Sequence, residues 1–300
     1  MLEPLGQGVA HRDEAVGPLA RGPRTGHVDA QGRVLHRRAH GRRRGEAQRG
    51  RERFQRHGAQ SGPRRPTAPR QGPYAATVED PAGRRVDYGD RRFDEHDLAP
   101  TPLAQFQAWY SDAVEAGVVE PNAMTVATAG ADGVSARTVL LKAVDGRGFV
   151  FYTNQRSRKA LAIAHDPRVA LLFTWHGTHR QVAVRGTAEE VPRAETEAYF
   201  ASRPYGSRIG AWVSEQSRTT PSAAALHERE AQLRERWPDT GSPDDVPTPP
   251  HWGGYLVRAL EVEFWQGRTS RLHDRLVLVA ADGPARLDDP APWRTERRQP

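Results

Sequence analysis

The chain has 300 residues, no cysteine and a formal net charge of +7. The lack of cysteine excludes disulfides, thiolate nucleophiles and Cys-ligated metal sites. No run of apolar residues approaches the length of about 20 that crosses a bilayer, and the N-terminus lacks the apolar segment of a signal peptide. A soluble, cytoplasmic protein is therefore expected.

Residues 1–80 differ sharply in composition from the rest of the chain. They hold sixteen arginines, no lysine and eight acids, a net charge of +8, whereas residues 81–300 carry a net charge of −1. Abundant Gly and Pro, with no helical or strand period, predict a disordered Arg-rich extension. A basic extension can neutralise phosphates and hold nucleic acid loosely. No aromatic interleaving or recognisable nucleic-acid module accompanies the charge, so a nucleic-acid partner is not expected. Another interpretation is that the assigned start lies upstream of the biological one. The composition changes abruptly near Val78–Tyr88, and Met124, the only methionine besides Met1, falls inside the first predicted strand.

The pattern of residues 81–300 predicts one mainly β domain with peripheral helices, an α+β fold. Apolar positions repeat at three- and four-residue steps from 102 to 118, which favours an amphipathic helix. Further helices are expected over 157–164, 193–202 and 222–237. Strands are expected over 123–129, 136–143, 148–154, 169–175, 181–190, 252–265 and 275–281. Turn-formers between neighbouring runs, and no alternating βαβ rhythm, predict a closed or partly closed antiparallel barrel.

The segment RTVLLK, residues 137–142, is a predicted strand with a cation at each end. Side chains alternate along a strand, so Arg137 and Lys142 are expected on opposite faces unless the strand bends. Basic residues that flank a buried strand are more often solvated than ligand-binding. This motif alone is therefore weak evidence for a phosphate site.

The segment FYTNQRSRK, residues 151–159, is stronger evidence for an anion site. An aromatic strand end leads into a turn, and then Ser157, Arg158 and Lys159 open a helix. A helix N-terminus offers unpaired N–H groups and the positive end of the dipole, so acids rather than cations would suit its first turn. Two adjacent cations at this place favour a phosphate-binding site.

The segment AYFASRPYGS, residues 198–207, carries a second set of candidate ligands. Tyr199 and Arg203 lie four residues apart on one helical face, and Ser207 follows Pro204. A phenol, a guanidinium and a hydroxyl that converge would suit a second phosphate. A surface arginine that caps the helix C-terminus beside a half-buried tyrosine explains the pattern equally well.

The segment WQGRTSRLHDR, residues 265–275, carries Arg271, His273 and Arg275 at alternate positions. In an extended chain they share one face, where they repel one another, so an anionic or electron-rich ligand is expected against them. His176 and His179 in the turn WHGTHR superficially suggest a metal pair. They lack a third ligand at a suitable spacing, so no metal site is expected.

Together these motifs resemble those of the pyridoxine/pyridoxamine 5′-phosphate oxidase family. The segments RTVLLK, FYTN followed by SRKA, RQV, SRPYGSRIGAWVSEQS, FWQG and RLHDR occur in the family's order and spacing, from about Arg85 to the C-terminus. The resemblance implies an FMN-binding split β-barrel and a homodimer with its FMN sites at the subunit interface. The chain end departs from the family's Trp followed by Arg-Leu-x-Pro. Arg298 stands where an apolar residue is usual, which leaves the packing of the terminus open.

The resemblance also implies roles for individual residues. FMN would be held by Arg137, Thr138, Val139, Leu140, Leu141, Lys142, Tyr152, Thr153, Arg158, Lys159 and Gln181, with Gln216, Ser217, Trp265 and Arg275 reaching it across the interface. The substrate would meet Arg85, Tyr88, Lys142, Tyr199, Arg203, Ser207, Arg271 and His273. Of these, Arg271 and His273 would be the catalytic residues that position and polarise the substrate.

The activity implied by the resemblance is oxidation of pyridoxine 5′-phosphate and pyridoxamine 5′-phosphate to pyridoxal 5′-phosphate, a step of vitamin B6 metabolism. Hydride would pass from C4′ of the substrate to N5 of the flavin, and O2 would reoxidise the flavin to give hydrogen peroxide, with ammonia released from the amine. Two other functions stay open. One is a related split-barrel flavoprotein with another substrate, such as a flavin reductase; the other is a non-catalytic FMN or pyridoxal phosphate binding protein.

Overall fold

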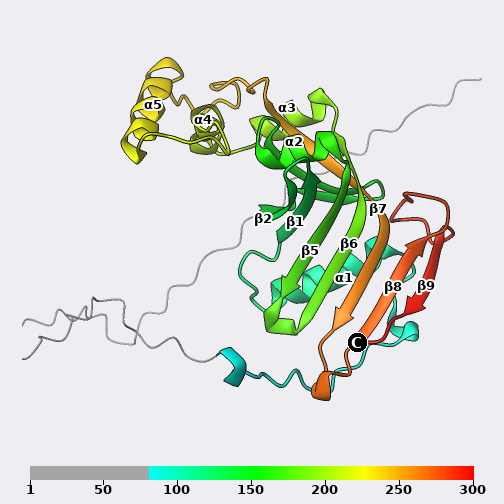
Figure 1. The fold of residues 1–300 in the computed structure, drawn as a ribbon. Helices are drawn as coiled ribbons and strands as arrows, with labels where there is room; N and C mark the ends of the chain where they lie inside the picture. Colours follow the sequence, from blue (N-terminus) through cyan, green and yellow to red (C-terminus); the bar gives the residue numbers. More distant parts are fainter. Residues whose placement is uncertain (1–80) are drawn as a thin grey trace, which may run out of the picture. The chain divides into compact units, whose positions relative to one another are not determined.

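The computed structural model describes residues 81–300, which form a nine-stranded antiparallel sheet with helices around it (Figure 1). The strands are β1 (Ala123–Gly130), β2 (Gly133–Leu140), β3 (Ala143–Asp145), β4 (Gly148–Asn154), β5 (Arg168–Trp175), β6 (Arg180–Glu190), β7 (Trp252–Gln266), β8 (Asp274–Ala280) and β9 (Trp293–Arg297). Their order is β2-β1-β5-β6-β7-β4-β3, with β8 paired to β7 and β9 to β8. The predicted antiparallel fold is confirmed, while the predicted extension over residues 1–80 lies outside the described residues.

Strand β7 is where the sheet divides. Its residues 252–257 pair with β4 and its residues 261–266 pair with β8, while β6 pairs along the other edge. The register of β6 against β7 shifts between Arg185 and Gly186, where Leu260 of β7 is the extra residue of a bulge, and a Cβ at Gly186 would collide with the carbonyl oxygen of Arg258. The sheet therefore forks at β7, which gives the split form of the barrel.

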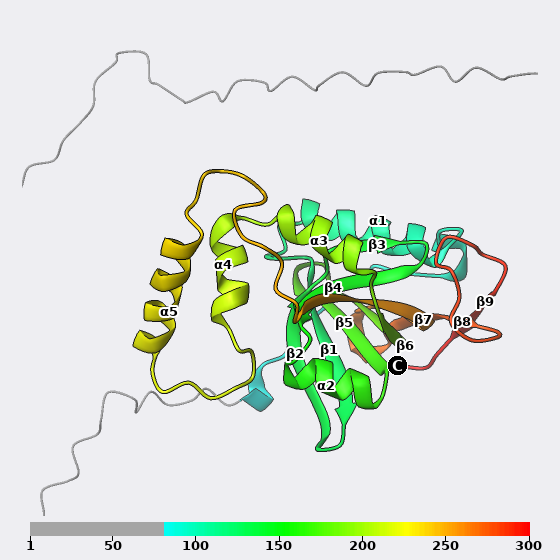
Figure 2. The ribbon, with the colours of Figure 1, turned by 90° about the horizontal axis from the view of Figure 1, so that it is seen from above.

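Five α-helices surround the sheet. They are α1 (Pro102–Glu115), α2 (Arg158–His165), α3 (Arg193–Ala201), α4 (Tyr205–Val213) and α5 (Ala223–Arg236). Helix α1 ends three residues before the predicted position 118, because Gly117 adopts a left-handed φ of 69°. Helix α4 was not predicted, and it lies beside α5 at one end of the sheet (Figure 2). None of the described helices is both long and apolar enough to cross a bilayer.

The main core lies between α1 and the sheet. Phe106 from α1 packs edge-on against Phe149 and Phe173, with ring centroids 5.1 and 5.0 Å apart. Along β5 every second residue is buried, as expected for a strand with one face on the core. Met124 of β1 belongs to the same core and is 1% exposed. This packing fixes the strands whose ends carry the candidate site residues.

The C-terminal strand β9 was also not predicted, and the structure answers the question that Arg298 raised. Instead of an apolar contact, Arg298 makes two hydrogen bonds to Glu261, from Nη1 to Oε1 at 2.9 Å and from Nη2 to Oε2 at 2.8 Å. Glu261 is only 9% exposed, and the guanidinium holds the pKa of its carboxyl below the usual range. An ion pair thus takes the place of apolar packing at the chain terminus.

Candidate functional site

A cavity of about 970 Å³ opens where β2, β4, α2, α3 and α4 meet. The residues that line it include five cations and, within residues 81–300, no Asp or Glu. The cations are Arg137, Lys142, Arg158, Lys159 and Arg203. The chain contains only two lysines, and both are in this set. Cations gathered without carboxylates repel one another, so this cavity suits an anionic ligand.

Arg137 and Lys142 line the same cavity, which corrects the expectation that they serve opposite faces. Strand β2 ends at Leu140, so the alternation of side chains stops before Lys142 is reached. Arg137 Nη1 donates to the Val126 carbonyl at 3.0 Å. Burial, and then the charge of Arg158, lower the pKa of Arg137. Leu141, by contrast, is 8% exposed and belongs to the apolar core.

Lys159 is the most enclosed cation of the cavity. It lies in the first turn of α2, after the N-cap Ser157, and is 7% exposed. Its Nζ donates to Gln216 Oε1 at 2.6 Å and to Thr153 Oγ1 at 2.8 Å, and no acid pairs with it among the described residues. Burial, and then the charge of Arg137, lower the pKa of Lys159 to about 8. A buried ammonium without a counter-ion at a helix N-terminus fits a phosphate group.

Arg203, between α3 and α4, is another cation of the cavity lining. Its guanidinium lies over the ring of Trp252, 4.7 Å from the centroid, and its buried Nη1 has no hydrogen-bond partner in the described part of the chain. Burial lowers the pKa of Arg203. An unsatisfied buried donor costs free energy of about 1–3 kcal/mol. A bound anion would satisfy it, so Arg203 is prepared for a ligand.

Three aromatic rings also line the cavity. Tyr152, Tyr199 and Trp252 stack on one another, with centroids 4.2 Å apart for Tyr152 and Tyr199, 5.2 Å for Tyr152 and Trp252, and 6.1 Å for Tyr199 and Trp252. Burial raises the pKa of Tyr152 to about 12, so its hydroxyl remains a neutral donor. Ser207, in the first turn of α4, also lines the cavity. The structure therefore brings together Tyr199, Arg203 and Ser207, as the sequence motif predicted.

Gln216 and Ser217 lie in the cavity of their own chain, which differs from the expectation that they act across a subunit boundary. Gln216 accepts hydrogen bonds from Thr153 and Lys159, and the Ser217 hydroxyl accepts one from the backbone N–H of Arg158 at 3.2 Å. Ser217 has a φ of 74°, in the left-handed region. The segment that follows α4 therefore folds back onto the start of α2.

A second cluster lies at the far end of β7. The ring of Trp265 lies 4.6 Å from His273 and 6.0 Å from Tyr88, measured between centroids. Tyr88 also contacts His179 at 4.8 Å, a residue that sequence reasoning assigned to a solvated loop. The guanidinium of Arg271 lies 6.0 Å from the centre of the Tyr88 ring. We refer to these five residues as the His273 cluster.

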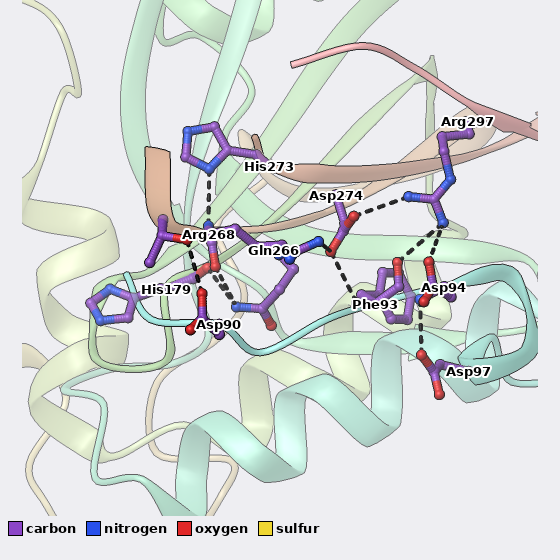
Figure 3. Close-up of polar contacts among 12 residues, drawn as sticks. Asp90, Phe93, Asp94, Asp97, His179, Gln266, Arg268, His273, Asp274 and Arg297 are labelled. Carbon is purple, nitrogen blue, oxygen red and sulfur yellow. Dashed lines mark hydrogen bonds and ion pairs between the residues drawn. The ribbon is translucent and has the colours of Figure 1, made fainter. Parts of the chain in front are cut away.

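The protonation of His273 follows from its surroundings. Its Nδ1 accepts a hydrogen bond from the backbone N–H of Arg268 at 3.0 Å (Figure 3). Burial, and then the charge of Arg271, lower the pKa of His273, although Asp274 opposes the shift. The ring is therefore neutral near pH 7, and its proton resides on Nε2. Arg268, the residue that fixes this tautomer, carried no signal in the sequence.

Arg275, Gln181 and Arg85 lie outside both groups, whereas Arg271 belongs to the His273 cluster but not in the predicted conformation. Arg271 belongs to a 3-10 turn, so it does not share an extended face with His273 and Arg275 as predicted. Arg275 is in β8 and pairs with Glu263 at 2.8 Å. Gln181 is opposite Trp265 in the register of β6 and β7, away from the cavity lining. Arg85 is exposed.

The cavity and the His273 cluster are well separated in one chain. Trp252, which lines the cavity, begins β7, and Trp265 lies thirteen residues later, which is roughly 40 Å along a strand at about 3.3 Å per residue. Figure 1 shows β7 running from the end near α3 to the opposite end of the sheet. A single small ligand therefore cannot touch both groups of the same chain.

Comparison with known proteins adds evidence of kinship. Residues 110–235 match the family profile for pyridoxamine 5′-phosphate oxidase, and residues 252–300 match the pyridoxine 5′-phosphate oxidase C-terminal dimerisation region. A pyridoxine/pyridoxamine 5′-phosphate oxidase of Burkholderia multivorans is 51% identical over 220 residues, which are 73% of this chain and 98% of the relative. The same enzyme of Rubrobacter xylanophilus is 51% identical over 222 residues, 74% of this chain and 97% of the relative.

Solved structures agree on the fold. PhzG from Burkholderia lata 383, solved with tetrahydrophenazine-1-carboxylic acid, superposes with a TM-score of 0.62 at 28% identity, covering 71% of this chain and 100% of PhzG. A pyridoxamine 5′-phosphate oxidase-related, FMN-binding protein of Nostoc punctiforme gives 0.51 at 17% identity, covering 68% of this chain and 99% of its own. The chain is about 50% identical to these relatives across nearly their whole length. It therefore belongs to the pyridoxine/pyridoxamine 5′-phosphate oxidase family of oxidoreductases.

Proposed function

We propose that the chain oxidises pyridoxine 5′-phosphate and pyridoxamine 5′-phosphate to pyridoxal 5′-phosphate in vitamin B6 metabolism. O2 is the final acceptor, hydrogen peroxide is released, and the amine also yields ammonia. FMN is the cofactor, as in the family to which the chain belongs. The observation that carries the proposal is the cavity lined by five cations and, within residues 81–300, by no acid. Two phosphorylated ligands, FMN and the substrate, account for so many unpaired cations.

Different residues of the cavity would hold the two ligands. Arg158 and Lys159, at the N-terminus of α2, would hold the FMN phosphate, with Gln216 and Ser217 beside them. Arg203, with its unsatisfied Nη1, would hold the substrate phosphate together with Tyr199, Ser207 and Lys142. A guanidinium offers a planar fork of donors that matches phosphate oxygens. The stacked rings of Tyr152 and Tyr199 exclude water from the wall between the two groups.

Bound FMN supplies the hydride acceptor and transfers the electrons to O2. The residues of the chain bind and orient the substrate. Anchoring of the substrate phosphate by Arg203 limits the poses of the ring, which converts binding energy into orientation. Neutral His273 would offer its Nε2–H to a substrate oxygen or nitrogen. The positive charge of Arg271 beside it lowers the pKa of His273 and so favours the neutral imidazole.

A homodimer would unite the cavity of one chain with the His273 cluster of its partner. The separation of the two groups along β7 supports this arrangement, as does the match of residues 252–300 to a dimerisation region. Arg203→Ala damages the cavity and His273→Ala damages the cluster, so each variant alone is expected to be weakly active. When the two are co-expressed, half of the dimers should be mixed, and each mixed dimer has one site that combines a wild-type cavity with a wild-type His273 cluster. About a quarter of all sites should therefore be intact. Activity no higher than that of the separate variants would contradict a site shared between subunits.

The reaction itself is tested by anaerobic stopped-flow mixing of the FMN-loaded protein with pyridoxamine 5′-phosphate. We expect rapid bleaching of the flavin absorbance, followed by its return and by peroxide when O2 is admitted. Bleaching by a reduced nicotinamide alone would indicate a flavin reductase. No bleaching with any donor would indicate a carrier that binds without turnover.

The likeness to PhzG raises a second candidate, oxidation of a carboxylated tricyclic substrate. The same stopped-flow experiment separates the two when a tetrahydrophenazine carboxylic acid replaces pyridoxamine 5′-phosphate. The cavity favours the phosphorylated substrate, because a single carboxylate would leave Arg203 and Lys142 only partly neutralised.

A further inference from the structure

Residues 87–97 form a strap that crosses the loop of residues 267–274, the loop that presents His273. The strap comes from the N-terminal side of the described chain, and the loop connects β7 to β8. Two sets of contacts fasten the strap, one near Tyr88 and one near Phe93, and Figure 3 shows some of the polar ones, including those of Asp274 with Phe93 and Arg297. The second set depends on Arg297, a residue close to the C-terminus that belongs neither to the cavity lining nor to the His273 cluster.

Asp274 is the junction of the second set. It directly follows His273, begins β8 and is 6% exposed. Its Oδ2 accepts the backbone N–H of Phe93 at 3.1 Å, and its Oδ1 accepts Arg297 Nη1 at 3.0 Å. Arg268 Nη1 lies 3.5 Å from Oδ2. A buried carboxylate thus ties the strap to the residue after His273 and is itself neutralised by Arg297.

Arg297 of β9 completes the fastening from the other side. Its Nη2 donates to Asp94 Oδ1 at 2.9 Å and to Glu95 Oε2 at 2.8 Å, and its Nε donates to Glu95 Oε1 at 2.9 Å. The hydrogen bond from Arg297 is the largest cause that lowers the pKa of Glu95 to about 2. One guanidinium therefore bridges two acids of the strap and the buried Asp274.

The first set of contacts holds Tyr88 on the His273 cluster. Thr269 donates from its backbone N–H to the Gly89 carbonyl at 3.0 Å and from its hydroxyl to Asp90 Oδ1 at 2.9 Å. Gly267 lies directly beneath the Tyr88 ring, since a Cβ there would come within 2.8 Å of it. These exposed bonds are weak alone. Release of the strap at Phe93 would leave them to hold Tyr88 by themselves.

We propose that Arg297 is a positioning residue for the active site: through Asp274 and the strap it holds Tyr88 against His273, although it touches neither. The proposal rests on the proposed function, in that His273 and Tyr88 are taken to face the substrate. Arg297 differs from Arg294, three residues earlier in β9, whose side chain is 68% exposed and pairs with Glu296. Arg294→Ala is therefore a matched control in the same strand.

The test begins with a spectroscopic reading of the strap. The chain has no cysteine, so Val86→Cys, at a 66% exposed side chain just before the strap, accepts a single nitroxide label. In the full-length, FMN-loaded protein we expect Arg297→Ala to convert the label from a slow to a fast spectrum, with Arg297→Lys in between and Arg294→Ala unchanged. This reading needs no substrate. A failure of the proposed function would therefore leave it intact.

Steady-state kinetics with pyridoxamine 5′-phosphate give the second reading. Arg297→Ala should raise KM about tenfold and lower kcat less than twofold, because the strap orders the substrate side while the flavin side is untouched. Arg297→Lys should recover part of the loss. An unchanged KM, or an unchanged label spectrum, overturns the proposal. If Arg297→Ala does not fold, the double variant Asp94→Asn with Glu95→Gln removes two of the three carboxylates and must shift both readings in the same direction.

Discussion

Arg203→Ala is expected to raise KM for pyridoxamine 5′-phosphate about a hundredfold, while kcat changes by only a few-fold. Truncation of a buried, hydrogen-bonded charge partner typically costs about 2–5 kcal/mol. Arg203 offers a buried Nη1 that has no hydrogen-bond partner among residues 81–300, so the free energy lost by leaving this donor unsatisfied is recovered when the substrate phosphate binds. The loss therefore falls mainly on binding, although some loss in kcat follows if the ring is less well oriented.

The measurement is steady-state oxidation with peroxide detection. Arg203→Lys keeps the charge but not the planar fork, and an intermediate KM is expected. Arg236→Ala is the control, because Arg236 is an exposed arginine at the end of α5, outside the cavity lining. Unchanged kcat and KM in Arg203→Ala would show that Arg203 does not bind the substrate.

Lys159→Met is expected to change two properties in opposite directions. FMN affinity should fall about a hundredfold, because a charge-assisted contact with the phosphate is lost. The apoprotein should become more stable by a few degrees in Tm, because methionine fills a similar volume without a buried charge. A residue kept only for packing would not show this opposition, since its loss would lower both quantities.

The pH dependence of the apoprotein gives an independent check on Lys159. The folded-state pKa is about 8, below the value of 10.5 for an unperturbed lysine. Between these two values the unfolded chain binds more protons than the folded chain, so the free energy of unfolding rises as pH rises. Below pH 8 the full penalty is present. Urea unfolding of the wild type from pH 7 to 10 should show the rise, and Lys159→Met should abolish this component.

A matched control for both readings is Arg156→Met. Arg156 lies three positions before Lys159, is exposed and does not line the cavity. We expect the Arg156→Met variant to match the wild type in FMN affinity and in the pH dependence of its free energy of unfolding. Calorimetric titration of FMN into the apoproteins measures the affinity. An Lys159→Met variant that binds FMN as tightly as the wild type would refute the assignment of the flavin phosphate.

Regular strands with clear apolar periodicity were predictable, and β4 agrees with its predicted bounds. Helix α4 was missed because Pro204, Gly206 and Gly210 lower its local propensity. Its formation depends on Ile209, which is fully buried in an apolar cluster with Phe200, Val246 and Trp252. Strand β9 has no apolar alternation, and it forms because β8 offers it an edge. In both elements tertiary contacts override the local sequence signal.

The candidate site was likewise predictable only in part. The cations at 158–159 and at 203 were visible because each lies within a short motif, although Arg203 follows the end of α3 instead of sharing a helical face with Tyr199 as predicted. The contact of Gln216 with Lys159 was not, because 57 residues separate them. The two acids that pair with Arg297 lie more than 200 positions before it. Such contacts depend on the path of the whole chain, which periodicity does not specify.

Met124 lies in the main core, almost wholly shielded from solvent, and the chain has no thiol. Peroxide attacks sulfur first, at accessible thiolates and thioethers. If turnover releases hydrogen peroxide as proposed, the described part of the chain presents no exposed sulfur to its own product. Inactivation during prolonged catalysis should therefore proceed without sulfoxide formation at Met124, and the enzyme should need no reductant to keep working.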